Sequence, residues 1–163
     1  MRASINAVIT HIKKDIVGAE VGVYEGSHAA QMATSDCIKK IYLIDSIEMP
    51  KLKEIINPHM SKLELLIPCT SEEAILKFQD NSLDFVYIDA DHTYENVKKD
   101  LEMWWKKVKV GGLLCGHDFS VEMLGTMKAI IEFSIKNSLQ LNHVVTYDPS
   151  QKTCSQSDWW LYK

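Results

Sequence analysis

Two groups of residues in this 163-residue chain have the types and spacing needed for chemistry on a bound ligand. The first is the segment Glu20-Val-Gly-Val-Tyr-Glu-Gly26, which is followed 19 residues later by Asp45 at the end of an apolar run. In an open α/β sheet, glycines after the first strand let the backbone approach an adenosine ligand, and a carboxylate after the second strand accepts hydrogen bonds from the ribose hydroxyls. The pairing therefore predicts an adenosine-binding site.

The glycine spacing separates two kinds of adenosine ligand. A dinucleotide fingerprint has the pattern Gly-x-Gly-x-x-Gly and places a pyrophosphate at a helix N-terminus, whereas three residues separate Gly22 from Gly26 here. Glu20 would repel a pyrophosphate but suits a ligand that carries an ammonium and a sulfonium. An NAD-dependent oxidoreductase is therefore the weaker alternative. A valine at Gly22 or Gly26 is expected to occupy the ligand's place and to leave the fold intact.

The second group of residues follows two later apolar runs. Asp89-Ala-Asp-His92 comes after the first of these runs, and Gly116-His-Asp-Phe119 comes after the next. Parallel strands end at one edge of a sheet, and ligands bind at that edge, so both groups are expected to meet there. The candidate residues are Glu20, Gly22, Tyr24, Glu25, Gly26, Asp45, Ser46, Thr70, Ser71, Asp89, Asp91, His92, His117 and Asp118.

Hydrophobic periodicity predicts the helices and strands that position these residues. Apolar residues at helical spacing from Ile5 to Ile16 predict a first helix that Gly18 ends, and those from Val97 to Val108 predict a helix that buries its tryptophans and ends at Gly111. Helices are also expected over 27–35, from Pro50, after a cap at 70–73, and after a cap at Ser120. The expected strands cover 19–23, 41–44, 63–67, 83–88, 113–116, 144–147 and 158–162, the last two joined by a loop containing Pro149, Ser150, Ser155 and Ser157.

The alternation of strands and helices predicts an α/β fold with a mostly parallel sheet that helices cover on both faces. The final pair of strands follows without a helix between them, so the last strand is expected to run antiparallel. A chain of this length suits one domain, over residues 1–163.

These residues resemble the class I S-adenosylmethionine-dependent methyltransferases over nearly the whole chain. The match includes the family's E-x-G-x-x-x-G loop, its ribose-binding acid at Asp45, its fourth strand at 83–89 and the turn Lys109-Val-Gly-Gly112 before its fifth strand. The resemblance implies a Rossmann-like seven-stranded sheet with the order 3-2-1-4-5-7-6. It also implies that S-adenosylmethionine binds at Glu20, Gly22, Tyr24, Glu25, Gly26, Asp45, Ser46, Thr70, Ser71 and Asp89.

Within this family, the second group of residues resembles the metal-assisted O-methyltransferases of catechols and sugars. The resemblance implies that Asp89, His117 and Asp118 hold a divalent metal such as Mn²⁺ or Mg²⁺, and that Asp91 is the catalytic base. If no metal binds, Asp91 or His117 is the candidate base. His117 departs from the family, which commonly has an acid or amide there, and imidazole suits Mn²⁺ better than Mg²⁺. The alternatives are a metal-free rim in which His117 bonds to Asp118, and a helix-capping role for Asp91.

The composition is that of a globular protein, with 46% hydrophobic and 25% charged residues and a net charge of -4. A basic face or tail for nucleic acid is not expected, and no apolar run reaches the ~20 residues that span a membrane. Four cysteines without a Cys-x-x-Cys pair indicate reduced thiols and a cytoplasmic protein.

The expected acceptor is the hydroxyl of a small molecule, such as a sugar or a catechol. Few residues precede the first strand, so we expect the acceptor pocket to come from loops near Asp91 and Phe119, from 148–158, or from a partner subunit, which a homodimer would supply. A second alternative is a module that binds S-adenosylmethionine without catalysis. The retained carboxylates after the fourth and fifth strands argue against it.

Overall fold

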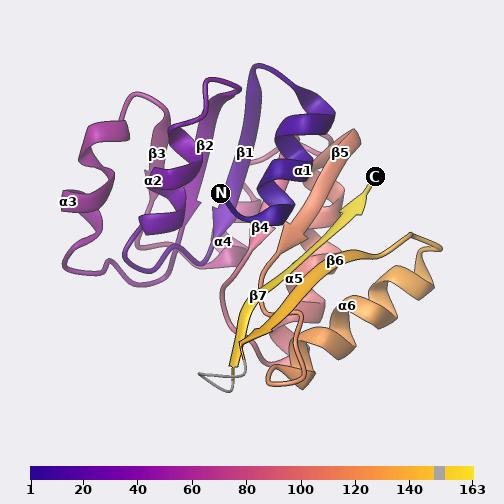
Figure 1. The fold of residues 1–163 in the computed structure, drawn as a ribbon. Coiled ribbons are helices and arrows are strands. Elements are labelled where there is room, and N and C mark those ends of the chain that lie inside the picture. The colour runs from indigo at the N-terminus through magenta and orange to yellow at the C-terminus, as the bar shows by residue number, and fades with distance from the viewer. Residues whose placement is uncertain (149–152) are drawn as a thin grey trace.

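The computed structural model describes residues 1–148 and 153–163, which form a seven-stranded sheet with the order β3-β2-β1-β4-β5-β7-β6 (Figure 1). Strands β1 to β5 are parallel to one another, whereas β7 runs antiparallel to both β5 and β6. The α/β class, the strand order and the antiparallel C-terminal pair are thereby confirmed. The strands are β1 (Ile16–Val21), β2 (Ile38–Ile44), β3 (Leu63–Leu66), β4 (Leu83–Ile88), β5 (Val108–Gly116), β6 (Asn142–Asp148) and β7 (Thr153–Tyr162).

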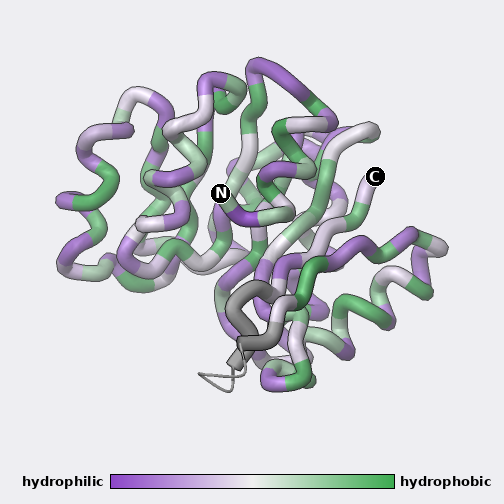
Figure 2. The backbone as a smooth tube through the Cα atoms, in the orientation of Figure 1, coloured by the Kyte–Doolittle hydropathy of each residue, from purple (hydrophilic) through white to green (hydrophobic). Residues whose placement is uncertain are grey.

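Two layers of helices enclose the sheet because each helix buries one apolar stripe against it (Figures 1 and 2). One core contains residues of α1, α2 and α3, and the other contains residues of α5 and α6, where Trp104 is fully buried as expected. No helix in the described part of the chain is long and apolar enough to cross a membrane. The helices are α1 (Ala3–Ile12), α2 (Ser27–Ala33), α3 (Leu52–Ile56), α4 (Ser71–Ile75), α5 (Tyr94–Lys107) and α6 (Leu124–Lys136), with a 3-10 turn η1 (Asn57–His59).

Two glycines that were expected to end helices lie inside strands instead. Gly18 belongs to β1, and a Cβ there would lie 2.1 Å from the Phe85 ring, so the glycine makes room for that ring. The strand begins at Ile16, which the helical pattern had assigned to the preceding helix. Gly111 lies within β5, which begins directly after α5, and its φ of 82° accompanies an irregular register between β4 and β5.

The boundaries after β5 also differ from the prediction. Helix α6 begins at Leu124, four residues beyond Ser120, and Ser120 is buried without serving as its cap. Ser155 and Ser157 lie in β7, not in a loop, because β7 pairs with β6 as far as Thr153. The predicted loop residues Pro149 and Ser150 lie outside the described residues.

Candidate active site

A cavity of about 840 Å³ lies at the carboxyl ends of β1, β2 and β4, the edge at which the sequence predicted a ligand. Its volume is in the range of sites for small molecules and cofactors. The structure brings the whole predicted cofactor set to this cavity: its lining includes Glu20, Gly22, Tyr24, Glu25, Gly26, Asp45, Ser46, Thr70, Ser71 and Asp89. Asp91, His92 and His117 also line it.

Asp45 fixes the loop that follows β1. Its Oδ2 accepts hydrogen bonds from the backbone N–H groups of Val23 at 2.8 Å and Tyr24 at 3.0 Å, and its Oδ1 accepts one from Ile47 at 3.0 Å. Tyr24 has a φ of 52° and a largely exposed side chain. The carboxylate that was predicted to bind a ribose therefore also holds the loop beside it, so its loss would affect both.

Gly22 allows β1 and β4 to approach each other beneath the cavity. Its φ is 88°, and a Cβ at this position would lie 2.1 Å from the carbonyl oxygen of Asp89. Gly26 has a φ of 85°, and a Cβ there would meet Leu52 and Ile56 of α3. Both glycines are thus required by neighbouring protein atoms and by the left-handed backbone, which differs from the expectation that a side chain would clash with the ligand alone.

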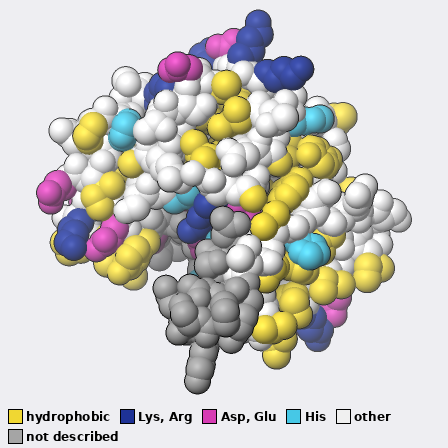
Figure 3. Space-filling model, in the orientation of Figure 1, with side chains coloured by type: hydrophobic (Ala, Val, Ile, Leu, Met, Phe, Trp, Pro, Cys, Tyr) yellow, Lys and Arg dark blue, Asp and Glu magenta, His cyan; other side chains and the backbone are white. Residues whose placement is uncertain are grey.

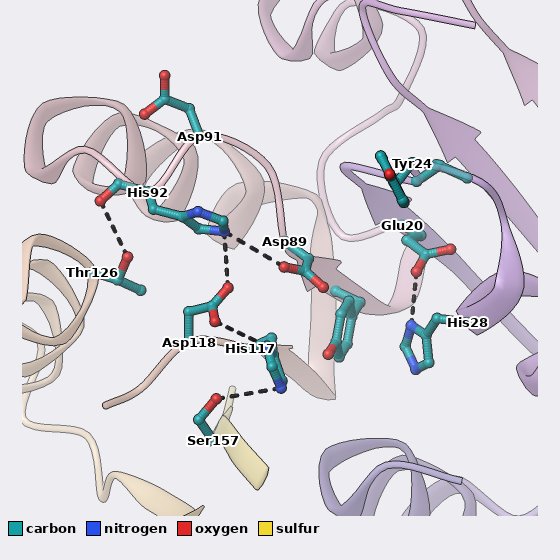
Figure 4. Close-up of polar contacts among 12 residues, drawn as sticks. Glu20, Tyr24, His28, Asp89, Asp91, His92, His117, Asp118, Thr126 and Ser157 are labelled. Atoms are coloured by element: carbon teal, nitrogen blue, oxygen red, sulfur yellow. Dashed lines mark hydrogen bonds and ion pairs between the residues drawn. The ribbon is translucent and has the colours of Figure 1, made fainter. Parts of the chain in front are cut away.

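Glu20 and His28 form a buried pair in one wall of the cavity (Figure 4). His28 Nδ1 lies 2.7 Å from Glu20 Oε1, and the side chains are 10% and 2% exposed, respectively. Burial raises the pKa of Glu20, while the hydrogen bond with His28 opposes that shift. Within the described chain, Glu20 Oε2 and His28 Nε2 are buried without a hydrogen-bond partner. Such groups are costly, which marks this wall as a place where a ligand or water is needed.

The segment from Thr70 lines the cavity at the start of α4. Thr70 caps this helix, as the sequence predicted, and the structure shows that it does so through a reciprocal capping box with Glu73. Ser71 donates a hydrogen bond to Asp100 of α5 and accepts one from Trp104 Nε1 at 2.8 Å. Burial raises the pKa of Asp100 to about 6, although the Ser71 hydrogen bond acts in the opposite direction. The hydrogen bonds of Ser71 with Asp100 and Trp104 therefore hold this rim of the cavity to α5.

The group of side chains that could hold a metal ion includes His92, which the sequence interpretation did not place among the ligands. Ligand atoms of Asp89, His92 and Asp118 lie within 4.8 Å of one another (Figure 4). His92 Nε2 lies 2.8 Å from Asp118 Oδ2 and 3.6 Å from Asp89 Oδ1, and these contacts, the Asp89 hydrogen bond first, raise the pKa of His92. One nitrogen and two carboxylates suit Mn²⁺ or Fe²⁺ better than Mg²⁺.

His117 is not part of this group. Its Nδ1 lies 3.1 Å from Asp118 Oδ1, while Nε2 faces Ser157 Oγ at 3.3 Å and its carbonyl oxygen accepts a hydrogen bond from Trp159. These contacts turn the ring toward β7, so His92 takes the place that the predicted ligand set gave to His117. Burial alone would raise the pKa of Asp118, but its hydrogen bond with His117 and the charges of His117 and His92 lower it.

The N-cap residue of α5 is Thr93, so the helix-capping role that was the alternative interpretation of Asp91 is wrong, and Asp91 instead contacts the backbone of that cap residue. Its Oδ1 accepts a hydrogen bond from the backbone N–H of Thr93 at 2.7 Å, directly before α5. Hydrogen bonds with Thr93 lower the pKa of Asp91. In Figure 4 the side chain projects away from the group formed by Asp89, His92 and Asp118. A depressed pKa and this orientation make Asp91 a weak proton acceptor.

Arg2 is a further cavity residue that the sequence interpretation missed. It precedes α1, yet its Nη1 donates hydrogen bonds to the hydroxyl of Tyr87 and, at 3.0 Å, to Asp89 Oδ2. Its side chain is 31% exposed and lines the cavity. A lone arginine near the start of a chain gives no local signal for this position, because its partners are more than 80 residues away.

Comparison with known proteins identifies the same region of the chain. A family model described as "Methyltransferase domain" matches residues 19–119, which include all the described residues that line the cavity except Arg2. Protein R132 of Acanthamoeba polyphaga mimivirus is 28% identical over 124 residues, which cover 70% of this chain and 56% of that protein. The chain thus spans little more than half the length of this relative.

Solved structures share the fold at low sequence identity. An O-methyltransferase from Bacillus cereus, solved in complex with SAH, superposes with a TM-score of 0.74 at 14% identity, covering 98% of this chain and 79% of that one. An rRNA methylase from Streptococcus thermophilus superposes with a TM-score of 0.71 at 16% identity, covering 98% and 93%. Proteins with this fold therefore include both an O-methyltransferase and an rRNA methylase.

Proposed function

The chain belongs to the methyltransferase domain family, and on this premise we propose that it transfers the methyl group of S-adenosylmethionine to a hydroxyl of a small molecule in the cytoplasm. The observation that carries the proposal is the convergence of Glu20, Gly22 and Asp45 on the cavity that also holds Asp89 and His92. This cavity combines an adenosine-binding edge with groups that can handle a proton. A binding module without catalysis would not need the second set.

The cofactor half of the proposal follows from the charges and shapes of the lining. The ribose hydroxyls can donate to Asp45, which lies at the end of β2, and the Thr70 rim is the place for the adenine. Glu20 supplies negative charge on the β1 side, where the ammonium and sulfonium would lie. A pyrophosphate would meet this carboxylate unfavourably, so NAD remains the weaker alternative.

A small acceptor is favoured over a nucleic acid by the distribution of charge. The chain has a net charge of -4, and on the described surface shown in Figure 3 basic side chains are interspersed with acidic ones and form no broad basic patch. Nucleic-acid binding depends on such patches because phosphates dominate the affinity. The fold alone leaves both kinds of acceptor open, as the rRNA methylase illustrates.

Residues of the cavity can activate an acceptor that is a poor nucleophile. An alcohol must lose its proton as it attacks, and a histidine held by a carboxylate can accept that proton. His92, bonded to Asp118 at 2.8 Å, has this arrangement. Asp89, His92 and Asp118 are also the residues that would hold a divalent ion, which would stabilise an alkoxide when bound. In both cases His92 matters more than Asp91.

The test is methyl transfer from S-adenosylmethionine to a panel of catechols, sugars and a short RNA, with purified His92→Ala and Asp91→Ala proteins beside the unaltered one. We expect transfer to at least one small hydroxyl compound. His92→Ala should lower kcat by at least about 100-fold, the scale of general acid–base catalysis, and Asp91→Ala by less than about tenfold. Asp91 and His92 are adjacent residues in the same loop, so the two alanine variants form a matched pair.

A chelator separates the two roles of His92. If activity falls in EDTA and returns with Mn²⁺, His92 acts as a ligand, and if activity is unchanged it acts as the base. Equal losses in the two alanine variants would contradict the assignment of His92. Transfer to RNA but to no small acceptor would overturn the substrate class, and turnover of NAD without any methyl transfer would overturn the proposal as a whole.

A further inference from the structure

Arg2 carries a permanent positive charge and lines the cavity together with the carboxylates of Glu20 and Asp89. Its Nη1 bonds to the Tyr87 hydroxyl and to Asp89 Oδ2, and its guanidinium carbon lies 5.4 Å from the centre of the Tyr87 ring. The ring of His28 packs against the same tyrosine, with 4.4 Å between ring centres. Because His28 is bonded to Glu20, Tyr87 contacts the guanidinium directly and is linked to the buried carboxylate through His28.

The contacts described for Arg2 anchor the guanidinium without using most of its donors. A guanidinium has five N–H groups in a planar fork, and the bonds to Tyr87 and Asp89 both use Nη1. The remaining edge belongs to a side chain that lines the cavity and is 31% exposed. An arginine fork fixed in this way is well suited to a carboxylate, which it can bind with two parallel hydrogen bonds.

The other strong cation of the cavity is paired with an acidic side chain. Among the described lining residues, Arg2 and Lys99 are the two with a Lys or Arg side chain. Lys99 pairs with Glu72 on α4, next to the Thr70 rim. A ligand group that needs a positive charge near Glu20 therefore has Arg2 as its partner.

The methionine portion of S-adenosylmethionine is an α-amino acid, so it presents an ammonium and a carboxylate on adjacent atoms. We infer that Arg2 binds this carboxylate while Glu20 faces the ammonium, an inference that rests on the cofactor in the proposed function. The two ends of the zwitterion then meet charges of opposite sign. Arg2 would act as a specificity-determining residue that distinguishes the intact amino acid from cofactor analogues without a carboxylate.

Titration calorimetry with three ligands tests this inference directly. S-adenosylmethionine has both charged groups, decarboxylated S-adenosylmethionine keeps the ammonium alone, and methylthioadenosine has neither. We expect Arg2→Met to weaken S-adenosylmethionine by at least about tenfold, in keeping with a lost charge-assisted pair, and to change binding of the other two by less than about twofold. Arg2→Lys should recover part of the loss because it restores the charge.

Lys99→Met is the matched control, since it removes the other lining cation and should not discriminate between the first two ligands. Equal losses for all three ligands in Arg2→Met would overturn the inference, because they would indicate that Arg2 only supports Tyr87 and Asp89. Unchanged binding of S-adenosylmethionine would overturn it as well. An unaltered protein that binds none of the three would refute the cofactor assignment itself, whereas one that binds the first two equally well contradicts the role of Arg2 alone.

Discussion

At Gly22 the backbone of β1 passes so close to β4 that an added side chain would meet protein atoms. Gly111 provides a matched control, because its φ of 82° is as unfavourable to other residues as the 88° of Gly22, yet a Cβ there would find no described atom within 4 Å. We expect Gly111→Ala to cost about 1 kcal/mol of unfolding free energy and Gly22→Ala at least about 2 kcal/mol more. Urea denaturation measures both, and equal costs would show that the contact with Asp89 is relieved cheaply.

Single residues could be predicted from the sequence where the signal was local. The glycine spacing and Asp45 predicted the loop after β1, because both lie at fixed offsets from one strand end. Arg2 and the contact of His92 with Asp118 had no such signal. Their partners are brought to them by the arrangement of strands, and only the folded chain shows which of two neighbouring histidines faces Asp89.

At the scale of elements, Asp100 links α5 to α4 and gives the fold a predictable pH dependence. Its folded pKa of about 6 lies above the ordinary value of 3.8, so the folded state binds the proton more tightly than the unfolded chain does. Stability that is present below pH ~4 is therefore lost as the pH rises through ~6, by up to about 3 kcal/mol. We expect Asp100→Asn, which can still accept from Ser71, to be more stable than the unaltered protein at pH 7 and nearly equal to it at pH 4.

Urea denaturation of the ligand-free protein at several pH values measures this difference. Asp80→Asn serves as the control, because Asp80 is an exposed carboxylate whose pKa is lowered by its hydrogen bond with Lys107. That variant should not gain stability between pH 4 and pH 7. A gain of the same size at both sites would indicate a general charge effect and would contradict a special role for burial at Asp100.

Element boundaries were predictable only where a local cap or turn decides them. The helix cap at 70–73 is predicted from four adjacent residues, and it was confirmed. The starts of β1 and β5 depend instead on what lies across the sheet: Gly18 is required by the Phe85 ring, and Gly111 lies where the register of β5 against β4 is irregular. Hydrophobic periodicity along the chain carries no information on the contact at Gly18 or on the register at Gly111.

For the whole molecule, the strand order came from the family resemblance, since alternation of helices and strands does not say which strands are neighbours. The order matters because it places β4 between β1 and β5. The loops that follow these strands therefore share one edge, with Asp45 supplied by β2 on the other side of β1. A ligand that fills the cavity should consequently stabilise the sheet as a unit.

Ligand-induced stabilisation tests this view of the cavity. A micromolar dissociation constant corresponds to about -8 kcal/mol, so 1 mM S-adenosylhomocysteine should stabilise the folded state by about 4 kcal/mol. For a chain of this size we expect Tm to rise by roughly 8–16 °C, and 1 mM NAD to leave it unchanged.

Asp45→Ala should weaken the binding of S-adenosylhomocysteine by roughly 1.5–3 kcal/mol, the scale of hydrogen bonds to a charged group. The substitution removes both the ribose acceptor and the bonds that hold the loop at Val23 and Tyr24. A larger shift with NAD than with S-adenosylhomocysteine would mean that the spacing of Gly22 and Gly26 does not exclude a pyrophosphate. An unchanged shift in Asp45→Ala would place the adenosine elsewhere in the cavity.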